Sequence, residues 1–178
     1  YFPGGETQTS ACNAQYACKR QLLQRTGRIS EVIKTGLENH MGKIIGYTQG
    51  TFDMFHIGHL NLIRNAKRHC DYLIVGVNKD ELVESYKNKR PIIPLEERVE
   101  IVRAIRYVDE VIATDTLDKT KIWEKVHFDE IYIGDDWKGN ERWEKTGKEM
   151  EQLGAKLVFL PYTKDTSSTM LREKLTQY

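Results

Sequence analysis

Two histidines in a glycine-containing segment carry the strongest chemical signal in the sequence. His56 and His59 are three residues apart, so both imidazoles can lie on one face of a helix. Gly58 between them would keep that face open, and Gly50 before them lets the backbone approach a ligand closely. A helix N-terminus offers free N–H groups and a positive dipole end, which suit phosphate. Imidazoles placed there could hold a triphosphate and stabilise the charge that develops during a displacement reaction.

Other uses of this segment compete with phosphate binding. A Walker loop needs a closing Lys-Ser/Thr pair and a dinucleotide fingerprint needs GxGxxG, and residues 49–59 contain neither. Two histidines at this spacing could ligate a metal, but no third ligand stands nearby, so we expect no metal held by the protein. A lone histidine in a helix is usually a surface or core residue. The Gly-Thr-Phe-Asp at residues 50–53 fits nucleotide binding better than a metal site or a histidine without a chemical role.

The elements that must position these histidines alternate regularly from residue 41 onward. Short apolar runs predict strands, and apolar residues at helical spacing predict helices. Strands are expected at residues 43–48, 72–77, 108–113, 130–133 and 156–160, and helices at 56–70, 95–105, 119–126, 141–153 and 167–175. This order predicts a Rossmann-like, doubly wound α/β domain with a parallel sheet and right-handed crossovers. Ligands of such folds bind at the carboxyl ends of strands, where residues 49–59 would lie.

The first forty residues differ in character from the rest. They begin rich in Gly, Gln, Thr and Ser and hold two of the three cysteines. We interpret residues 1–40 as an N-terminal extension and residues 41–178 as the catalytic domain. The extension is either a vector-derived segment or a helix, from about Ser10 to Glu38, that packs on the domain or on a partner subunit.

Composition excludes several classes of protein. Of the 178 residues, 39% are hydrophobic and 30% charged, which is typical of a globular domain rather than a disordered chain. The net charge of +1 does not provide the broad basic surface of a nucleic-acid-binding protein. We find no apolar run near the ~20 residues that a membrane span needs, and no secretory signal pattern. The odd cysteine count, with Cys70 at the end of an expected helix, favours a reducing cytoplasm.

The histidine segment resembles the signature of a known superfamily. Gly-Thr-Phe-Asp at residues 50–53, followed by His-Ile-Gly-His at 56–59, is similar to the HxGH motif of nucleotidylyltransferases. Members transfer a nucleoside monophosphate from a triphosphate to a phosphate or carboxylate and release pyrophosphate, usually with Mg²⁺. The segments at residues 106–109, 134–137 and 166–169 narrow the resemblance to the glycerol-3-phosphate cytidylyltransferase branch. This implies CTP and a small phosphorylated alcohol as substrates, Mg²⁺ with the nucleotide, and a homodimer.

The resemblance assigns roles to individual residues. His56 and His59 would contact the CTP phosphates and stabilise the transition state, with Lys87 and Arg106 as further catalytic cations. The expected nucleotide-binding residues are Gly50, Thr51, Phe52, His56, Gly58, His59, Asp135, Thr166, Ser167, Ser168 and Thr169. The expected substrate-binding residues are Lys87, Lys89, Asp53 and Trp137.

Alternatives remain open for several of these residues. Asp53 either braces the loop or caps the following helix, because aspartate accepts hydrogen bonds from free helical N–H groups. Lys87 and Lys89 fall in residues 85–90, expected to be a flexible basic loop that closes over a polyphosphate or stays solvated. Arg106 could instead interact with a helix dipole. Trp137 either stacks on a ligand or packs against the protein.

The last motif departs from the branch. Related cytidylyltransferases often carry Arg-Thr-Glu-Gly-Ile-Ser-Thr, whereas this chain has Tyr162 in place of the arginine. Lys164 could restore the charge, but as a point charge rather than a planar fork. The hydroxyl cluster that opens the last helix is kept. The departure affects phosphate contacts and the choice of acceptor, not the class of reaction.

The sequence favours a direct displacement in which the acceptor phosphate attacks the α-phosphorus of CTP. It shows no Ser-His-Asp set or activated cysteine, which argues against a covalent intermediate. Alternatives within the superfamily are cytidylyl transfer to an ethanolamine, choline, ribitol or phosphonate acceptor, and adenylyl transfer to a flavin, heptose or pantetheine precursor. The non-enzymatic alternative is a nucleotide-sensing module, for which intact His56 and His59 would be unnecessary.

Overall fold

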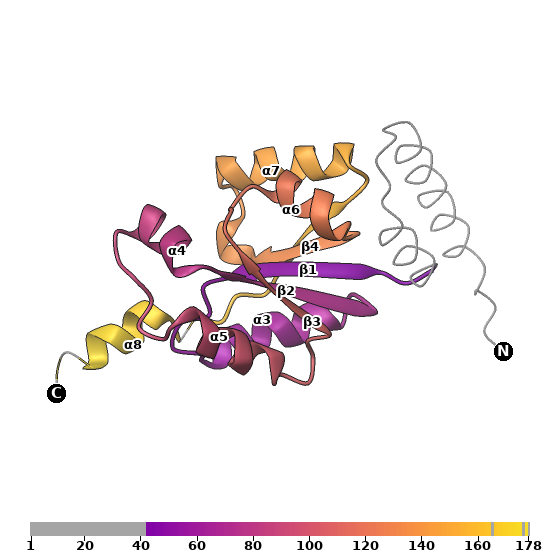
Figure 1. The fold of residues 1–178 in the computed structure, drawn as a ribbon. Coiled ribbons are helices and arrows are strands. Elements are labelled where there is room, and N and C mark those ends of the chain that lie inside the picture. Colours follow the sequence, from indigo (N-terminus) through magenta and orange to yellow (C-terminus); the bar gives the residue numbers. More distant parts are fainter. Residues whose placement is uncertain (1–41, 165, 176, 178) are drawn as a thin grey trace. The chain divides into compact units, whose positions relative to one another are not determined.

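The computed structural model describes residues 42–164, 166–175 and 177. The proposals for residues 1–40 lie outside this part of the chain. In the described part, five parallel strands form one sheet in the order β3-β2-β1-β4-β5 (Figure 1). The strands are β1 (Ile45–Gly50), β2 (Tyr72–Asn78), β3 (Glu110–Thr114), β4 (Glu130–Gly134) and β5 (Lys156–Leu160). The order reverses between β1 and β4, which is the switch point at which open α/β sheets bind their ligands.

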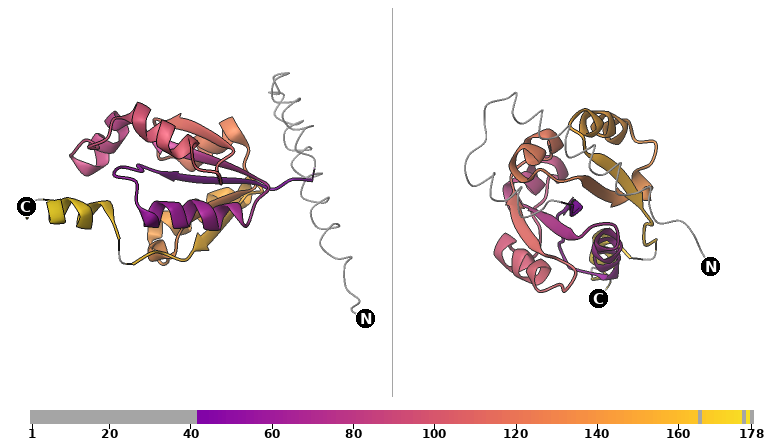
Figure 2. Two further views of the ribbon diagram at one scale, coloured as in Figure 1. Left: turned by 90° about the horizontal axis from the view of Figure 1, so that it is seen from below. Right: turned by 90° about the vertical axis from the view of Figure 1, so that its right-hand side faces the viewer.

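Helices cover both faces of the sheet, as the turned views of Figure 2 also show. They are α3 (Ile57–Lys67), α4 (Asp80–Lys87), α5 (Leu95–Arg103), α6 (Lys119–Val126), α7 (Glu141–Gln152) and α8 (Ser168–Leu175), with the short 3₁₀ helix η1 (Asp135–Trp137) after β4. The predicted Rossmann-like parallel α/β domain is therefore confirmed. One of the described helices, α4, falls where the sequence predicted a loop.

The core has two clusters, one on each face of the sheet. Buried residues of α3 and α5, such as Ile63 and Val102, pack with Val75 and Val77 on one face. Ile122 and Trp123 of α6 pack with the other face, to which Met150 of α7 also contributes. β1 and β2 are buried along most of their length because helices cover them from both sides.

The carboxyl ends of the strands are where functional groups gather. β1 runs two residues further than predicted, to Gly50, so the histidine segment begins directly at the edge of the sheet. Both α4 and α8 lie at this same edge (Figures 1 and 2). The first turn of α3 therefore lies close to segments that are distant from it in the sequence.

Candidate active site

The histidine pair lies in the first turn of α3. His56 is the N-cap residue, and its Nδ1 accepts a hydrogen bond from Gly58 N at 3.1 Å. The imidazoles of His56 and His59 stack with their centroids 3.8 Å apart, so the prediction that both lie on one face is confirmed. Because Nδ1 of His56 is an acceptor, the proton of the neutral ring is on Nε2. That proton faces Ser168 Oγ, which is 3.5 Å away.

Gly58 is required by the packing around this pair. A Cβ on Gly58 would lie 2.9 Å from Cε1 of His56 and 3.4 Å from the carbonyl oxygen of Thr166. Any side chain would push the imidazole out of its capping position or displace the segment before α8. The predicted role of Gly58, to keep the face between the histidines open, agrees with this geometry.

His59 is held as a neutral imidazole. Burial lowers its pKa to about 3, and the nearby charges of His56 and Lys87 act in the same direction. Its ring lies at 5.3 Å from the ring of Phe52 and at 5.5 Å from that of Phe55, measured between centroids. The buried Nδ1 of His59 makes no hydrogen bond within the described residues. An unpaired buried nitrogen is costly, which makes this atom a candidate contact for a ligand. Burial also lowers the pKa of His56.

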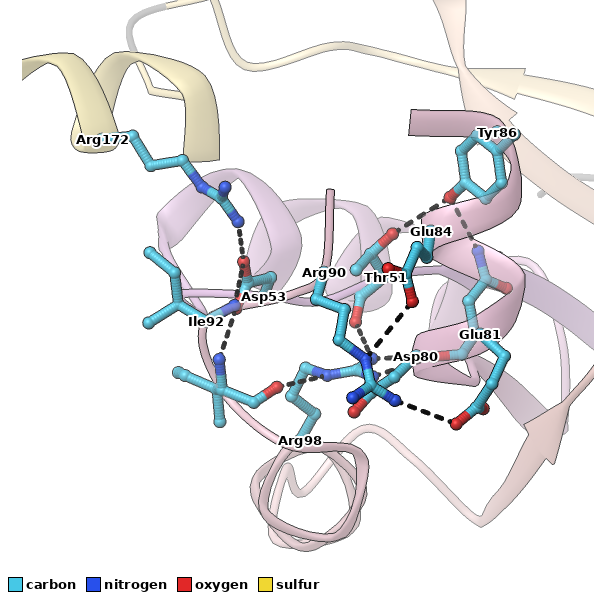
Figure 3. A network of polar contacts seen from close by, with 12 residues as sticks. Thr51, Asp53, Asp80, Glu81, Glu84, Tyr86, Arg90, Ile92, Arg98 and Arg172 are labelled. Carbon is cyan, nitrogen blue, oxygen red and sulfur yellow. Dashed lines mark hydrogen bonds and ion pairs between the residues drawn. The ribbon is translucent and has the colours of Figure 1, made fainter. Parts of the chain in front are cut away.

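Asp53 braces the loop between β1 and α3. Its carboxylate accepts hydrogen bonds from the backbone N–H groups of Ile92 and Ile93 at 3.0–3.1 Å and pairs with Arg172 of α8 at 2.5 Å (Figure 3). Burial opposes the charged form, but these contacts outweigh it and hold the pKa of Asp53 below its usual value. The alternative that Asp53 caps α3 is wrong, because His56 occupies that position.

The loop itself has a strained backbone. Phe52 and Met54 adopt φ angles of 53° and 50°, in the left-handed region that non-glycine residues seldom occupy. Phe52 is buried, and its ring would contact any Cβ added to Gly50, at 3.1 Å. Such strain persists only where surrounding contacts fix the backbone, and it is common where a loop must present groups to a ligand.

Arg98 provides one of those contacts, and the sequence analysis missed it. Its side chain is fully buried beneath the loop. The guanidinium donates to the carbonyl oxygens of Thr51, Asn78 and Ile93 and pairs with Asp80 (Figure 3). It thus joins the ends of β1 and β2 to the segment before α5. A signal was available, because Arg98 falls on the apolar stripe of its helix.

The N-terminus of α8 closes over the histidine segment. Ser168 Oγ donates to the carbonyl oxygen of Asp53 at 2.9 Å. Ser167 Oγ accepts from Met170 N and so caps the helix. Arg172, one turn further along, pairs with Asp53 and is the second cation near the loop that sequence reasoning missed. It lies three residues after Thr169, a spacing at which helical side chains share a face.

A cavity of about 260 Å³ lies between α4 and α8. Its walls are built from Thr51, Asp53, Val83, Lys87, Lys89, Arg90, Pro91, Ser168, Thr169 and Arg172. Four of these side chains are cationic and one is a carboxylate, so the cavity suits a polyanion. The histidines stand beside the cavity, next to Ser168. The structure therefore brings together the predicted residues Thr51, Asp53, Lys87, Lys89, Ser168 and Thr169.

Lys87 is not in a loop, contrary to prediction. It is the last residue of α4, and the chain leaves the helix through Asn88, whose φ is 53°. The error arose because residues 80–87 are mostly polar and Val83 is the buried residue of this helix. Arg90, which follows the helix, forms ion pairs with Glu81 and Glu84 of α4 (Figure 3). The prediction of a flexible basic loop is thus wrong for the residues before Asn88.

Arg106 lies at the amino ends of the strands, whereas the candidate site lies at their carboxyl ends. It precedes the first residue of β3, Glu110, which pairs in register with Ile74 near the start of β2. Gly50, at the start of the candidate site, pairs with Val77 near the end of β2. Arg106 instead donates to Tyr107 Oη at 2.8 Å. Within one chain, the prediction that Arg106 reaches the triphosphate is therefore corrected, because α5 carries the chain away from the carboxyl edge.

Asp135 and Trp137 lie in η1, at the correct edge but outside the cavity walls. Asp135 accepts a hydrogen bond from Tyr162 N at 2.9 Å, which ties the end of β4 to the segment after β5. Trp137 is half exposed and lies 6.4 Å from Trp143, between ring centroids. Tyr162, at the position where relatives often have arginine, is also half exposed.

Among the described residues, no group of three or more His, Cys, Asp or Glu side chains is arranged to hold a metal ion. The described part of the chain also contains no helix long and apolar enough to cross a membrane.

Comparison with known proteins agrees with this geometry. A family described as cytidylyltransferase-like matches residues 47–174. The chain belongs to this family. The FAD synthase of Thermococcus kodakarensis is 38% identical over 71% of this chain and 85% of its own length. The glycerol-3-phosphate cytidylyltransferase of Bacillus subtilis is 36% identical over 76% of this chain and 98% of its own length.

Other relatives share the fold but differ in size. The ethanolamine-phosphate cytidylyltransferase of Dictyostelium discoideum is 43% identical over 68% of this chain, which corresponds to 34% of that protein. The crystal structure of a lipopolysaccharide core biosynthesis protein from Thermoplasma volcanium superposes with a TM-score of 0.59 at 26% identity, over 70% of this chain and all of that protein. Relatives of similar identity thus carry names for different substrates, and the site must decide among them.

Proposed function

We propose that this nucleotidyltransferase moves CMP from CTP to a small phosphorylated alcohol, glycerol 3-phosphate being the preferred acceptor, and releases pyrophosphate. The observation that carries the proposal is the stacked pair His56 and His59 beside a cavity with four cationic side chains. That arrangement suits two phosphorylated substrates that must meet despite their negative charges.

In the proposed reaction, an oxygen of the acceptor phosphate attacks the α-phosphorus of CTP in line with the leaving pyrophosphate. One P–O bond forms as the bond to pyrophosphate breaks. A phosphate monoester is already an anion near neutral pH, so no general base is required. The protein contributes positioning and charge neutralisation.

Each residue has a part in this mechanism. The Nε2–H of His56, set by the capping hydrogen bond to Nδ1, donates to a triphosphate oxygen. His59 supplies a second imidazole from a water-poor setting, where a hydrogen bond to a charged oxygen is strong. Lys87, Lys89 and Arg172 neutralise charge from the cavity wall. Mg²⁺ enters with CTP as part of the substrate and neutralises further phosphate charge.

The length match supports the glycerol acceptor. The chain covers 98% of the Bacillus subtilis glycerol-3-phosphate cytidylyltransferase, a protein that carries this activity in its name. The competing candidate is adenylyl transfer to a flavin, favoured by the similar identity to the archaeal FAD synthase. Both candidates use the same histidines, so nucleotide and acceptor must be varied together.

The test is pyrophosphate release, with CTP, ATP, GTP and UTP each combined with glycerol 3-phosphate, phosphoethanolamine, phosphocholine, ribitol 5-phosphate and FMN in the presence of Mg²⁺. Release with CTP and glycerol 3-phosphate is the expected result. Release with ATP and FMN would replace the proposal with FAD synthesis. Release with no pair, while CTP still raises the thermal stability, would indicate a nucleotide-sensing module.

A further inference from the structure

A chain of side-chain hydrogen bonds runs from the buried start of α6 to the wall of the cavity. It begins at Lys119, whose Nζ donates to Gln49 Oε1 at 2.7 Å. The Nε2 group of Gln49 donates to the carbonyl oxygen of Thr116 at 2.9 Å. A lysine ammonium only donates and a carbonyl oxygen only accepts, so two separate contacts fix the orientation of the Gln49 amide. Both ends of this amide are engaged within the protein, and Gln49 therefore acts on the cavity only through its next partner.

The next partner is Asn78, the last residue of β2. Gln49 Nε2 donates to Asn78 Oδ1 at 2.7 Å. Because Oδ1 is the accepting end of the amide, the Nδ2 group of Asn78 is the end that faces Tyr86, and it donates to Tyr86 Oη at 3.2 Å. Asn78 is buried, and its backbone carbonyl oxygen accepts from Arg98. The direction set at Gln49 is thus passed on without ambiguity.

The chain reaches the cavity through Tyr86 and Thr51. Tyr86 Oη lies 3.2 Å from Thr51 Oγ1 (Figure 3). A phenol has one proton to donate, and since its oxygen already accepts from Asn78, that proton is available for Thr51. Thr51 Oγ1 is then the acceptor of this contact. The proton of the Thr51 hydroxyl is left for the cavity, whose wall includes Thr51.

A hydroxyl oriented in this way complements the cations of the cavity. Lys87, Lys89 and Arg172 bring charge on long side chains, whereas Thr51 is a short side chain on the loop that directly follows β1. A hydroxyl can donate or accept, and only donation favours an anionic oxygen. A donor that is oriented before the ligand arrives needs no reorganisation. Hydrogen bonds that run in one direction also polarise one another, which strengthens the last donor.

We propose that Tyr86 is a positioning residue that makes the Thr51 hydroxyl a hydrogen-bond donor to a phosphate oxygen in the cavity, with its own direction set by Asn78 and Gln49. This inference rests on the proposed function, which supplies the phosphorylated substrates. Thr51 contacts the phosphate, and Tyr86 acts only through Thr51. The phosphate belongs either to CTP or to the acceptor, and the kinetic measurement below separates these two sources.

The experiment measures the affinity of the full chain for inorganic tripolyphosphate by isothermal titration calorimetry. Four proteins form a cycle: the wild type, Thr51→Val, Tyr86→Phe and the double variant. Thr51→Val keeps the shape of the side chain but removes the hydroxyl, and it should weaken binding about tenfold. Tyr86→Phe should weaken binding about three- to tenfold in the wild-type background and should have no further effect in Thr51→Val.

Two variants control for indirect effects. Tyr72→Phe removes a hydroxyl that also makes a 3.2 Å contact, with Glu110, but at the amino end of β2, so it should bind tripolyphosphate like the parent. Thr51→Ser keeps the hydroxyl and should stay sensitive to Tyr86→Phe. Tyr86 is 41% exposed, so Tyr86→Phe should fold normally, which thermal melting would check. If Thr51→Val does not fold, Thr51→Ala takes its place in the cycle.

Steady-state kinetics with CTP, glycerol 3-phosphate and Mg²⁺ identifies the phosphate that Thr51 contacts. A higher KM for CTP in Tyr86→Phe assigns the contact to the nucleotide, and a higher KM for glycerol 3-phosphate assigns it to the acceptor. If no pyrophosphate is released while the tripolyphosphate cycle gives the expected coupling, the proposed function is overturned and this inference stands.

Three outcomes would overturn the inference itself. The first is a wild type that does not bind tripolyphosphate. The second is a Tyr86→Phe variant with the parental affinity. The third is an equal loss from Tyr86→Phe in the wild-type and Thr51→Val backgrounds, which would show that Tyr86 acts through the packing of α4 and not through Thr51.

Discussion

The imidazole rings of His56 and His59 stack with their centroids 3.8 Å apart, and only one of them has a satisfied Nδ1. The Nδ1 of His56 accepts the hydrogen bond that caps α3, whereas the Nδ1 of His59 is buried and makes no hydrogen bond within the described residues. The pair is therefore asymmetric: His56 holds the helix and points its Nε2 toward Ser168, and His59 offers a desolvated imidazole beside it. Both features are present before any substrate arrives, which is the preorganisation that charge stabilisation requires.

Replacing His59 should remove one of the two groups that stabilise the transition state. We expect His59→Ala to lower kcat by about 10²- to 10³-fold, or on the order of 2 to 4 kcal/mol of barrier, as for a lost oxyanion donor. The matched control is His69→Ala, since His69 is exposed two residues beyond the end of α3. Steady-state pyrophosphate release would measure both. A His59→Ala variant that works at the parent rate would refute the assignment.

The pH dependence should show that the histidines of the free enzyme are neutral. Burial lowers the pKa of His59 to about 3, so His59 stays neutral across the usual histidine range, and burial also lowers the pKa of His56. A profile of kcat/KM for CTP reports groups of the free enzyme. We expect no inflection from His59 near pH 6.5. An inflection there that disappears in His59→Gln would contradict the neutral pair.

The ion pair between Asp53 and Arg172 should couple the loop to α8. Because hydrogen bonds and Arg172 outweigh burial and lower the pKa of Asp53, its stabilising contribution is full above the unfolded pKa and is lost as the pH falls through the folded value. We expect Asp53→Asn to reduce the free energy of unfolding by about 1 to 3 kcal/mol at pH 7. Urea denaturation at pH 7 and at about pH 3 would measure this.

The loss in Asp53→Asn should shrink at the lower pH, where the parent carboxylate is itself being protonated. A loss that is the same at both pH values would show that the charge of Asp53 does not stabilise the fold. Asp136→Asn is the control, because burial raises the pKa of that partly exposed carboxyl, and its loss should not destabilise the protein at pH 7.

Much of this architecture could be predicted from the sequence, and the failures have physical causes. The strands were predictable because apolar runs such as residues 72–77 are buried on both faces, and the histidine segment followed from local spacing. α4 was missed because residues 80–87 are mostly polar and Val83 is the buried residue of this helix. Arg172 reaches Asp53 across 119 residues of sequence, and such a contact has no local signal. Arg106 was misplaced because the family resemblance assigns it a role but does not say at which end of the strands it lies.

Replacing Arg98 should destabilise the protein far more than replacing a similar residue on the same helix. Arg98 is fully buried and holds the carbonyl oxygens of Thr51, Asn78 and Ile93, which would be left unpaired in Arg98→Met. We expect a loss of about 3 to 5 kcal/mol in the free energy of unfolding, the usual result of breaking a buried charged network. The control is Arg103→Met, since Arg103 is exposed at the end of α5.

Chemical denaturation of both variants at pH 7 would measure the difference, and Arg103→Met should lie within about 0.5 kcal/mol of the parent. Arg98→Lys should recover little, because a single ammonium cannot replace a planar group that donates to several carbonyl oxygens at once. Arg98→Met should also raise the KM for CTP, because the hydrogen bond from Arg98 to the Thr51 carbonyl oxygen fixes the loop that precedes the histidines. An Arg98→Met variant with parental stability would show that the strained loop is held by Asp53 and α8 alone.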